Sequence, residues 1–234
     1  MGRSLIHFPG WSRLPDHVLP ASFFDRDAQK VAQDLLGKVL RHHYQGLWLS
    51  CRIIETEAYY LHEKGSHASL GFTEKRKALF MPPGTIYMYF SRGGDSLNFS
   101  CRGDGNAVLI KSAFADPLVI SSAELRMMRE LNPVKGSGRK RPLRKLCSGQ
   151  TLLCRSLALK VRQWDQHQMH PDRFYLADTG YVPTRVIQTT RMGIPQGRDE
   201  HLPYRFIDER YAAYCTKNPL RMQAPPTYTF LTHK

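Results

Sequence analysis

Long apolar runs are missing from this chain of 234 residues, and no stretch approaches the roughly 18 uninterrupted apolar positions that a membrane-spanning helix needs. The first twenty residues also lack a basic segment that leads into an apolar one, and residue six is not the Ser or Thr of a myristoylation signal. We therefore expect no contact with a membrane and a cytoplasmic location.

The chain also lacks the cysteine pattern of a disulfide framework or a zinc ribbon. Its five cysteines are odd in number and form no Cys-x-x-Cys pair. We expect buried, reduced thiols, and neither a metal nor a cofactor. No repeat of about 20 to 50 residues and no low-complexity segment is present.

Acidic residues are scarce. Asp and Glu total 20 against 34 Lys and Arg, which gives a formal charge of +14 and a pI near 9.8. Such an excess costs self-repulsion and is typical of proteins whose partner is a polyanion, so it favours a nucleic acid. A charge that serves solubility alone is the alternative. The length fits one domain, and 41% hydrophobic with 23% charged residues is an ordinary globular mixture.

Local patterns predict strands that are joined by hairpins, with helices between them. We expect helices over 27–36 (capped by Asp25 and ended by Gly37), 122–131 and 152–159, and strands over 38–43, 47–59, 85–91, 95–101, 107–111, 185–191 and 204–207. This order is typical of an α+β domain with a mainly antiparallel sheet. The predicted boundaries are an arm over 1–22, a domain over 23–220 and a tail over 221–234.

The strand over 47–59 has an unusual composition. Because alternate residues share a face, one face should carry Leu49, Cys51, Ile53, Glu55, Glu57 and Tyr59. Two carboxylates at the end of an apolar face would cost several kcal/mol if buried without partners. The pattern therefore indicates a site that is open, hydrogen-bonded or functional.

The predicted hairpin has Gly93 and Gly94 at its tip, a two-residue turn in which both glycines can adopt positive φ. This register places Tyr89 opposite Asn98, so that an aromatic ring lies beside an amide.

A basic loop spans residues 133–145 and includes Lys135, Arg139 and Lys140. Such a loop suits a phosphate backbone, although a merely solvated run of charge is equally compatible with the sequence.

Several motifs occur in a characteristic order. They are Arg52-Ile53-Ile54-Glu55-Thr56-Glu57-Ala58-Tyr59, Ser66-His67, Phe80-Met81-x-Pro83-Gly84-Thr85-x-Tyr87-x-Tyr89, Asn98, Gly103-x-Gly105-Asn106-Ala107-Val108-Leu109, Leu146-Cys147-Ser148-Gly149, Leu153-Cys154, Leu157-Ala158, Arg191-Met192-Gly193 and Pro203-x-Arg205-Phe206. Over residues 24–218 this series resembles the alkyladenine (3-methyladenine) DNA glycosylase family. The resemblance implies a single α+β domain, with a curved sheet and a protruding hairpin, that excises alkylated or deaminated purines from duplex DNA without a metal.

The resemblance also implies roles for individual residues. Glu57 matches the general base, whereas the residues by themselves leave Glu55 as a nearly equal rival. Tyr59 and Tyr89 match stacking tyrosines around an everted purine, and His67 completes the slot. Asn98 matches an amide that excludes normal guanine. Lys111 is expected to contact DNA where the family often has arginine, and it keeps the charge but loses the bidentate fork.

The hairpin departs from the family pattern because it is one residue shorter between Tyr89 and Asn98. Arg92 falls at the position of the large side chain that fills the gap left by the flipped base. We expect its guanidinium to contact DNA by stacking in the gap and reaching a phosphate, although it is a poorer apolar plug. We expect a monomeric, monofunctional enzyme of DNA repair that is associated with the nucleoid. The rivals are a DNA-binding protein that has lost turnover and an enzyme that acts on RNA or free nucleosides.

Overall fold

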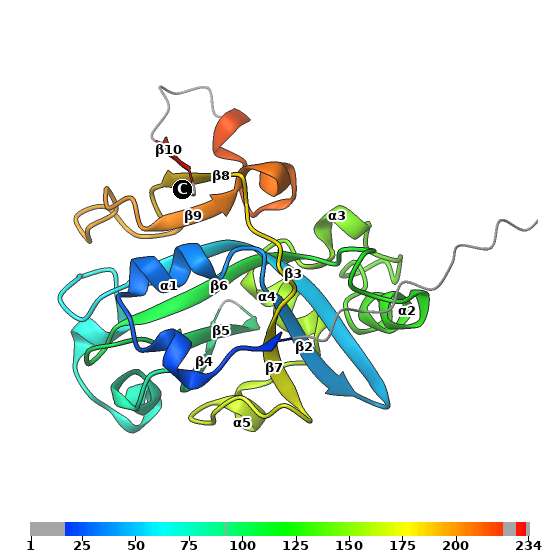
Figure 1. The fold of residues 1–234 in the computed structure, drawn as a ribbon, viewed down its shortest axis with the longest axis horizontal. Helices are drawn as coiled ribbons and strands as arrows, with labels where there is room; N and C mark the ends of the chain where they lie inside the picture. The colour runs from blue at the N-terminus through cyan, green and yellow to red at the C-terminus, as the bar shows by residue number, and fades with distance from the viewer. Residues whose placement is uncertain (1–16, 92, 222–227, 233–234) are drawn as a thin grey trace, which may run out of the picture.

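The computed structural model describes residues 17–91, 93–221 and 228–232, and it is organised around one antiparallel sheet (Figure 1). The main path of the sheet runs β1-β7-β2-β3-β6-β5-β4, and β9, β8 and β10 branch from β3. The strands are β1 (His17–Val18), β2 (Val39–Tyr44), β3 (Leu47–Tyr59), β4 (Ile86–Ser91), β5 (Gly94–Ser100), β6 (Ala107–Phe114), β7 (Phe174–Asp178), β8 (Arg185–Thr189), β9 (Arg205–Asp208) and β10 (Tyr228–Thr232).

Short helices lie around this sheet. The α-helices are α1 (Ala28–Asp34), α2 (Ser122–Leu131), α3 (Leu143–Leu146), α4 (Gln150–Ser156) and α5 (Val161–Trp164). The 3-10 helices are η1 (Ala21–Phe24), η2 (His67–Leu70), η3 (Glu74–Phe80), η4 (Glu209–Tyr214) and η5 (Pro219–Arg221). The expected α+β class with a mainly antiparallel sheet is thereby confirmed. In the part of the chain that the structure describes, none of the helices has the length and apolar character of a membrane span.

The main core joins α1 to the central strands and contains Cys51, Cys147 and Cys154. All five cysteines are free and buried, as expected. Burial raises the pKa of Cys101 and Cys154 well above that of an ordinary thiol, so both stay protonated.

Strand β3 is long enough to pair with β6 along much of its length, with β2 at its start and with β9 near its end. The expected single face along β3 is wrong, because the register with β6 shifts on both sides of Glu55. Ile53 belongs to the core before this irregularity, whereas beyond it Ala58 belongs to the core and the Thr56 hydroxyl donates to Ala32 O of α1 (2.8 Å). The irregularity thus separates the carboxylates from the apolar face.

The expected hairpin register is also wrong, by two residues. Asn98 pairs with Tyr87, and Ser91 pairs with Gly94. Gly94 therefore belongs to the ladder, and Gly93, at φ 78°, is the described tip residue with positive φ. Gly94 is required for another reason: a Cβ atom there would lie 2.1 Å from the methyl carbon of Thr151 in α4.

Two helix predictions need correction. Asp27, not Asp25, caps α1, because its Oδ1 accepts from the amides of Gln29 and Lys30 (3.0 and 3.2 Å). Helix α4 begins two residues early and ends at Ser156, since Ala158 adopts φ 55°. The apolar run continues beyond the point where the helical backbone stops.

The predicted helix over 122–131 matches α2, which starts with a capping box between Ser121 and Glu124. At the ends of the described chain, β1 pairs with β7 and β10 pairs with β8. Parts of the expected arm and tail therefore join the sheet, while the domain boundaries themselves stay a prediction.

Candidate active site

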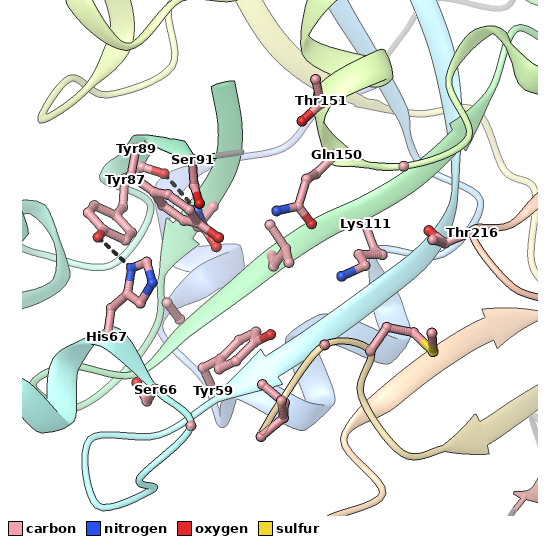
Figure 2. Close-up of a pocket in the computed structure, with 18 of the residues that line it drawn as sticks. Tyr59, Ser66, His67, Tyr87, Tyr89, Ser91, Lys111, Gln150, Thr151 and Thr216 are labelled. Carbon is pink, nitrogen blue, oxygen red and sulfur yellow. Dashed lines mark hydrogen bonds between the residues drawn. The ribbon is translucent and has the colours of Figure 1, made fainter. Parts of the chain in front are cut away.

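A pocket of about 710 Å³ opens between the β4–β5 hairpin, the segment around η2 and the chain after β8. Figure 2 shows side chains from these elements directed into one space, with Lys111 and Gln150 facing Tyr59, His67 and Tyr89. The pocket is lined by Tyr59, Gly65, Ser66, His67, Leu70, Leu79, Tyr87, Tyr89, Ser91, Asn98, Gly105, Ala107, Leu109, Lys111, Ser148, Gly149, Gln150, Thr151, Leu152, Met192, Gly193, Ile194, Pro195, Arg198 and Thr216.

Aromatic rings form one part of this wall. The rings of His67 and Tyr89 meet edge to face, with centroids 4.5 Å apart. Tyr87 supports them, because its hydroxyl lies 3.0 Å from Nδ1 of His67. Tyr87 was not expected as a site residue, although the two-residue spacing from Tyr89 on one strand was a signal for it.

His67 is an uncharged member of this group at neutral pH. Partial burial lowers the pKa of its imidazole, and the cations of Arg76 and Arg198 lower it further. A neutral imidazole has one donor and one acceptor nitrogen, so it can hydrogen-bond to a base or a sugar without adding charge.

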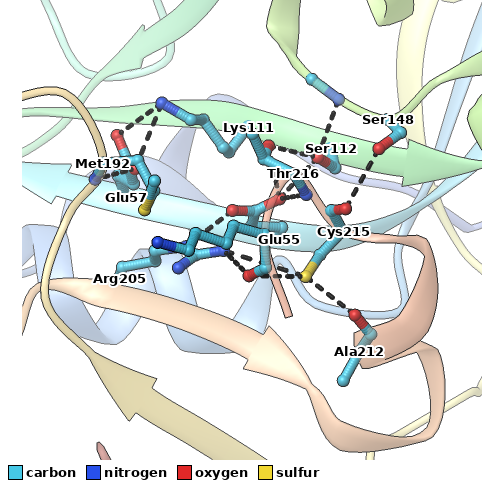
Figure 3. A network of polar contacts seen from close by, with 12 residues as sticks. Glu55, Glu57, Lys111, Ser112, Ser148, Met192, Arg205, Ala212, Cys215 and Thr216 are labelled. Atoms are coloured by element: carbon cyan, nitrogen blue, oxygen red, sulfur yellow. Dashed lines mark hydrogen bonds and ion pairs between the residues drawn. The ribbon is translucent and has the colours of Figure 1, made fainter. Parts of the chain in front are cut away.

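Glu57 contacts residues that line the pocket, and Figure 3 shows Lys111 and Met192 around its carboxylate. Its carboxylate is fully buried and is not part of the lining, but its partners are. The Tyr59 hydroxyl donates to Oε2 (2.7 Å), and the Met192 amide donates to Oε1 (3.1 Å). Lys111 Nζ lies 3.3 Å from Oε1.

These partners determine the protonation of Glu57. Burial by itself would raise the pKa of the carboxyl. The Lys111 cation and the hydrogen bonds from Tyr59 and Met192 outweigh burial, so the pKa of Glu57 lies below its ordinary value. Burial and the adjacent carboxylate raise the pKa of Tyr59, so its hydroxyl keeps the proton that it donates. The site therefore holds an ionised carboxylate under an aromatic pocket.

Glu55 has a different environment. Oε1 accepts from Arg205 Nε (2.6 Å), and Oε2 accepts from the Ser112 hydroxyl (2.5 Å). The amide and hydroxyl of Thr216 also donate to Oε2 (2.8 and 3.0 Å). Both oxygens are thus engaged in contacts that join β3, β6 and β9 to the chain after η4, which makes Glu55 a cross-link of the fold.

Amide side chains complete the pocket. Asn98 is buried, and its Nδ2 donates to Tyr87 O (3.0 Å). This hydrogen bond fixes the orientation of the Asn98 amide. Gln150, at the start of α4, donates from Nε2 to the Ser96 hydroxyl (3.0 Å). Gln150 was not expected as a site residue.

The structure brings Tyr59, His67, Tyr89, Asn98 and Lys111 to one pocket. Lys111 was expected at the DNA, and here its Nζ atom is turned toward Glu57.

The expected wedge residue, Arg92, lies outside the described residues. Lys135, Arg139 and Lys140 are exposed between α2 and α3. Figure 1 places α2 and α3 at the opposite end of the molecule from η2 and η3, and the three residues are not part of the pocket lining. Among the described residues, no group of three or more His, Cys, Asp or Glu side chains could hold a metal ion.

A family model and several related proteins point to the same family. The family model for methylpurine-DNA glycosylase matches residues 22–212. Proteins named "Putative 3-methyladenine DNA glycosylase" from Pseudomonas syringae pv. syringae and Pseudomonas fluorescens are 61% and 62% identical, over 89% and 87% of this chain and 91% and 88% of their own lengths. A protein of the same name from Carboxydothermus hydrogenoformans is 32% identical over 81% of this chain and 94% of its own length.

Proposed function

The chain belongs to the methylpurine-DNA glycosylase family, and we propose that it releases alkylated or deaminated purines of the 3-methyladenine type from duplex DNA. The product is an abasic site, and the reaction is the first step of base excision repair. The net charge of +14 suits a polyanionic substrate.

The reaction is hydrolysis of the N-glycosidic bond, with Glu57 as general base. Water forms a bond to C1′ while the bond from C1′ to the purine nitrogen breaks and its electron pair leaves with the base. Glu57 accepts the proton of the water and stabilises the positive charge that develops on the sugar. A purine that is already cationic leaves most readily.

The observation that carries this proposal is the ionised, buried carboxylate next to a pocket with aromatic walls. A nucleotide leaves the DNA stack at a cost of a few kcal/mol, and stacking on an aromatic side chain returns about 1–3 kcal/mol per base. Tyr59 and Tyr89 supply the stacking faces, and His67 hydrogen-bonds to the base or the sugar. Asn98 crowds the exocyclic amino group of a normal guanine.

Lys111 connects substrate binding to the basicity of Glu57, the general base. Its flexible side chain covers Glu57 and reaches the pocket surface. When the nucleotide enters, the ammonium turns from the carboxylate to a DNA phosphate and admits the attacking water. Loss of the adjacent cation raises the pKa of Glu57, which makes it a stronger base at that moment.

We further propose a monofunctional enzyme that acts as a monomer. Among the described residues that line the pocket, Lys111 is the one lysine, and in the structure its Nζ is turned toward Glu57, 3.3 Å from Oε1. Borohydride added during turnover should therefore trap no covalent complex with DNA. An adduct that disappears in Lys111→Met would contradict this proposal.

One assay tests the function directly. The purified protein is incubated with duplexes that each carry one lesion, including 7-methylguanine, ethenoadenine and hypoxanthine, and alkali-labile abasic sites are measured. Glu57→Gln should abolish most of the excision and keep lesion binding. A wild-type protein that binds these duplexes but yields no abasic product would favour the rival reading of a DNA-binding protein without turnover. Matched RNA duplexes and free nucleosides test the other rival.

A further inference from the structure

One wall of the pocket consists of two loops, residues 60–67 and 191–199, that are tied together below the surface. Arg198 Nε donates to Lys64 O (2.8 Å) near the outside of this wall. The innermost link is the ion pair between Glu63 and Arg191, whose side chains are 1% and 0% exposed. A buried ion pair is costly to desolvate, so its position in the wall calls for an explanation.

The guanidinium of Arg191 is surrounded by partners that fix its plane. Nη1 donates to Ala58 O (2.9 Å) and pairs with Glu63. The central carbon lies 4.5 Å from the ring centre of Tyr59 and 5.5 Å from that of Tyr204. Within the described residues, Nε and Nη2 have no hydrogen-bond partner, and the two aromatic rings contribute cation–π contacts to the guanidinium.

Both neutral donors to Glu57 depend on this guanidinium. Tyr59, which donates through its hydroxyl, has its ring against Arg191, and Met192, which donates through its amide, is the next residue in the chain. We propose that Arg191, held by Glu63, is a positioning residue that aligns these two donors on the catalytic carboxylate. This inference rests on the proposed role of Glu57 as general base.

The flat guanidinium is essential to this role. A lysine would keep the charge and could still reach Ala58 and Glu63 through its ammonium, but it would lose the flat surface that packs on Tyr59. Poor alignment of a catalytic group by about 1 Å can cost about 100-fold in rate.

The remaining charged and titratable groups around Glu57 are left intact by substitution of Arg191 or Glu63. They are Lys111 on β6, Arg205 on β9 and Tyr89 on β4. Arg191→Lys keeps the charge at this position, so a change in the titration of Glu57 in that variant reports on the two donors. Glu63→Gln leaves the Arg191 cation without its partner, which by itself would lower the pKa of Glu57, so an upward shift in that variant also reports on the donors.

The test uses Arg191→Lys and Glu63→Gln in the full chain, with single-turnover base release measured against pH on the best lesion duplex. We expect the rate at neutral pH to fall by about 10- to 100-fold while the affinity for lesion DNA stays unchanged. Weaker hydrogen bonds to a carboxylate raise its pKa, so the acid limb of the pH profile should move up by about one pH unit.

Arg52→Lys is the matched control. It disturbs another buried ion pair of β3, in which Arg52 Nε lies 2.8 Å from Asp116, away from the pocket lining. This control should lower the melting temperature and leave the acid limb in place.

The inference is overturned if the acid limb of the pH profile stays in place in both Arg191→Lys and Glu63→Gln and their rate losses are no larger than that of Arg52→Lys. If Arg191→Lys does not fold, Glu63→Gln decides the question, because it keeps the size of the side chain. Absence of abasic product in the wild type would instead refute the proposed function.

Discussion

Replacement of Lys111 by methionine tests the electrostatics of the site most directly. Lys111 Nζ lies 3.3 Å from Oε1 of Glu57, and the lysine side chain is 10% exposed. Two unit charges about 4 Å apart interact by about 4 kcal/mol at an effective dielectric constant of about 20. Removal of an opposite charge at this range shifts a carboxyl pKa by about one to three units, or about 1.4–4 kcal/mol.

The direction of the pH dependence of stability follows from the difference between the folded and unfolded pKa of Glu57. In the wild type, folding lowers the pKa of Glu57, so the carboxylate stabilises the fold above its unfolded pKa, and this stabilisation is lost as the pH falls through the folded pKa. In Lys111→Met the folded pKa of Glu57 rises, because the cation that opposes the effect of burial is gone. The variant should therefore lose stability relative to the wild type as the pH rises from about 4 to about 7.

The assay is urea unfolding at several pH values, with Lys30→Met as a control, since Lys30 is an exposed residue of α1. The difference in unfolding free energy between Lys111→Met and the wild type should be larger at pH 7 than at pH 4, and the control should show none. A difference that does not vary with pH would refute the argument that Lys111 sets the ionisation of Glu57.

Three further outcomes are expected. Tyr89→Ala should lose lesion discrimination more than nonspecific affinity, as measured by competition with undamaged duplex, and equal losses would remove Tyr89 from the stacking slot. Alanine at Lys135, Arg139 and Lys140 together should flatten the slope of log affinity against log salt, and an unaltered slope would show that this loop is only solvated. Gly94→Ala should cost about 1–3 kcal/mol of stability by collision of its Cβ with α4, and an unchanged melting temperature would contradict the close packing.

The β4–β5 hairpin, whose tip is one residue shorter than in the family pattern, is held by contacts with two neighbouring helices. Arg155 Nη2 of α4 donates to Gly93 O (2.8 Å), and Asp95 accepts from Lys160 Nζ and the Val161 amide (3.3 and 3.1 Å). The tip is therefore anchored to α4 and to the start of α5. Such anchoring reduces the entropy that the hairpin would lose on binding DNA.

The local elements of this protein follow from short stretches of its sequence. The strand predicted over 47–59 is β3, and the helix predicted over 122–131 is α2. Tyr59, His67, Tyr89, Asn98 and Lys111, which the motifs single out, line one pocket, while their roles stay a prediction. The predicted strand and helix succeed because backbone propensity and side-chain periodicity depend on neighbours within a few residues.

The different surroundings of the two carboxylates arise from contacts between distant parts of the chain. The irregular register of β3 turns Glu55 and Glu57 away from the apolar face, which no local pattern reports. The donor from Met192 to Glu57 is a backbone amide 135 residues away, and Arg205 reaches Glu55 across 150 residues. A backbone amide carries no side-chain signature, and a contact over such a separation exists only once the whole sheet has formed.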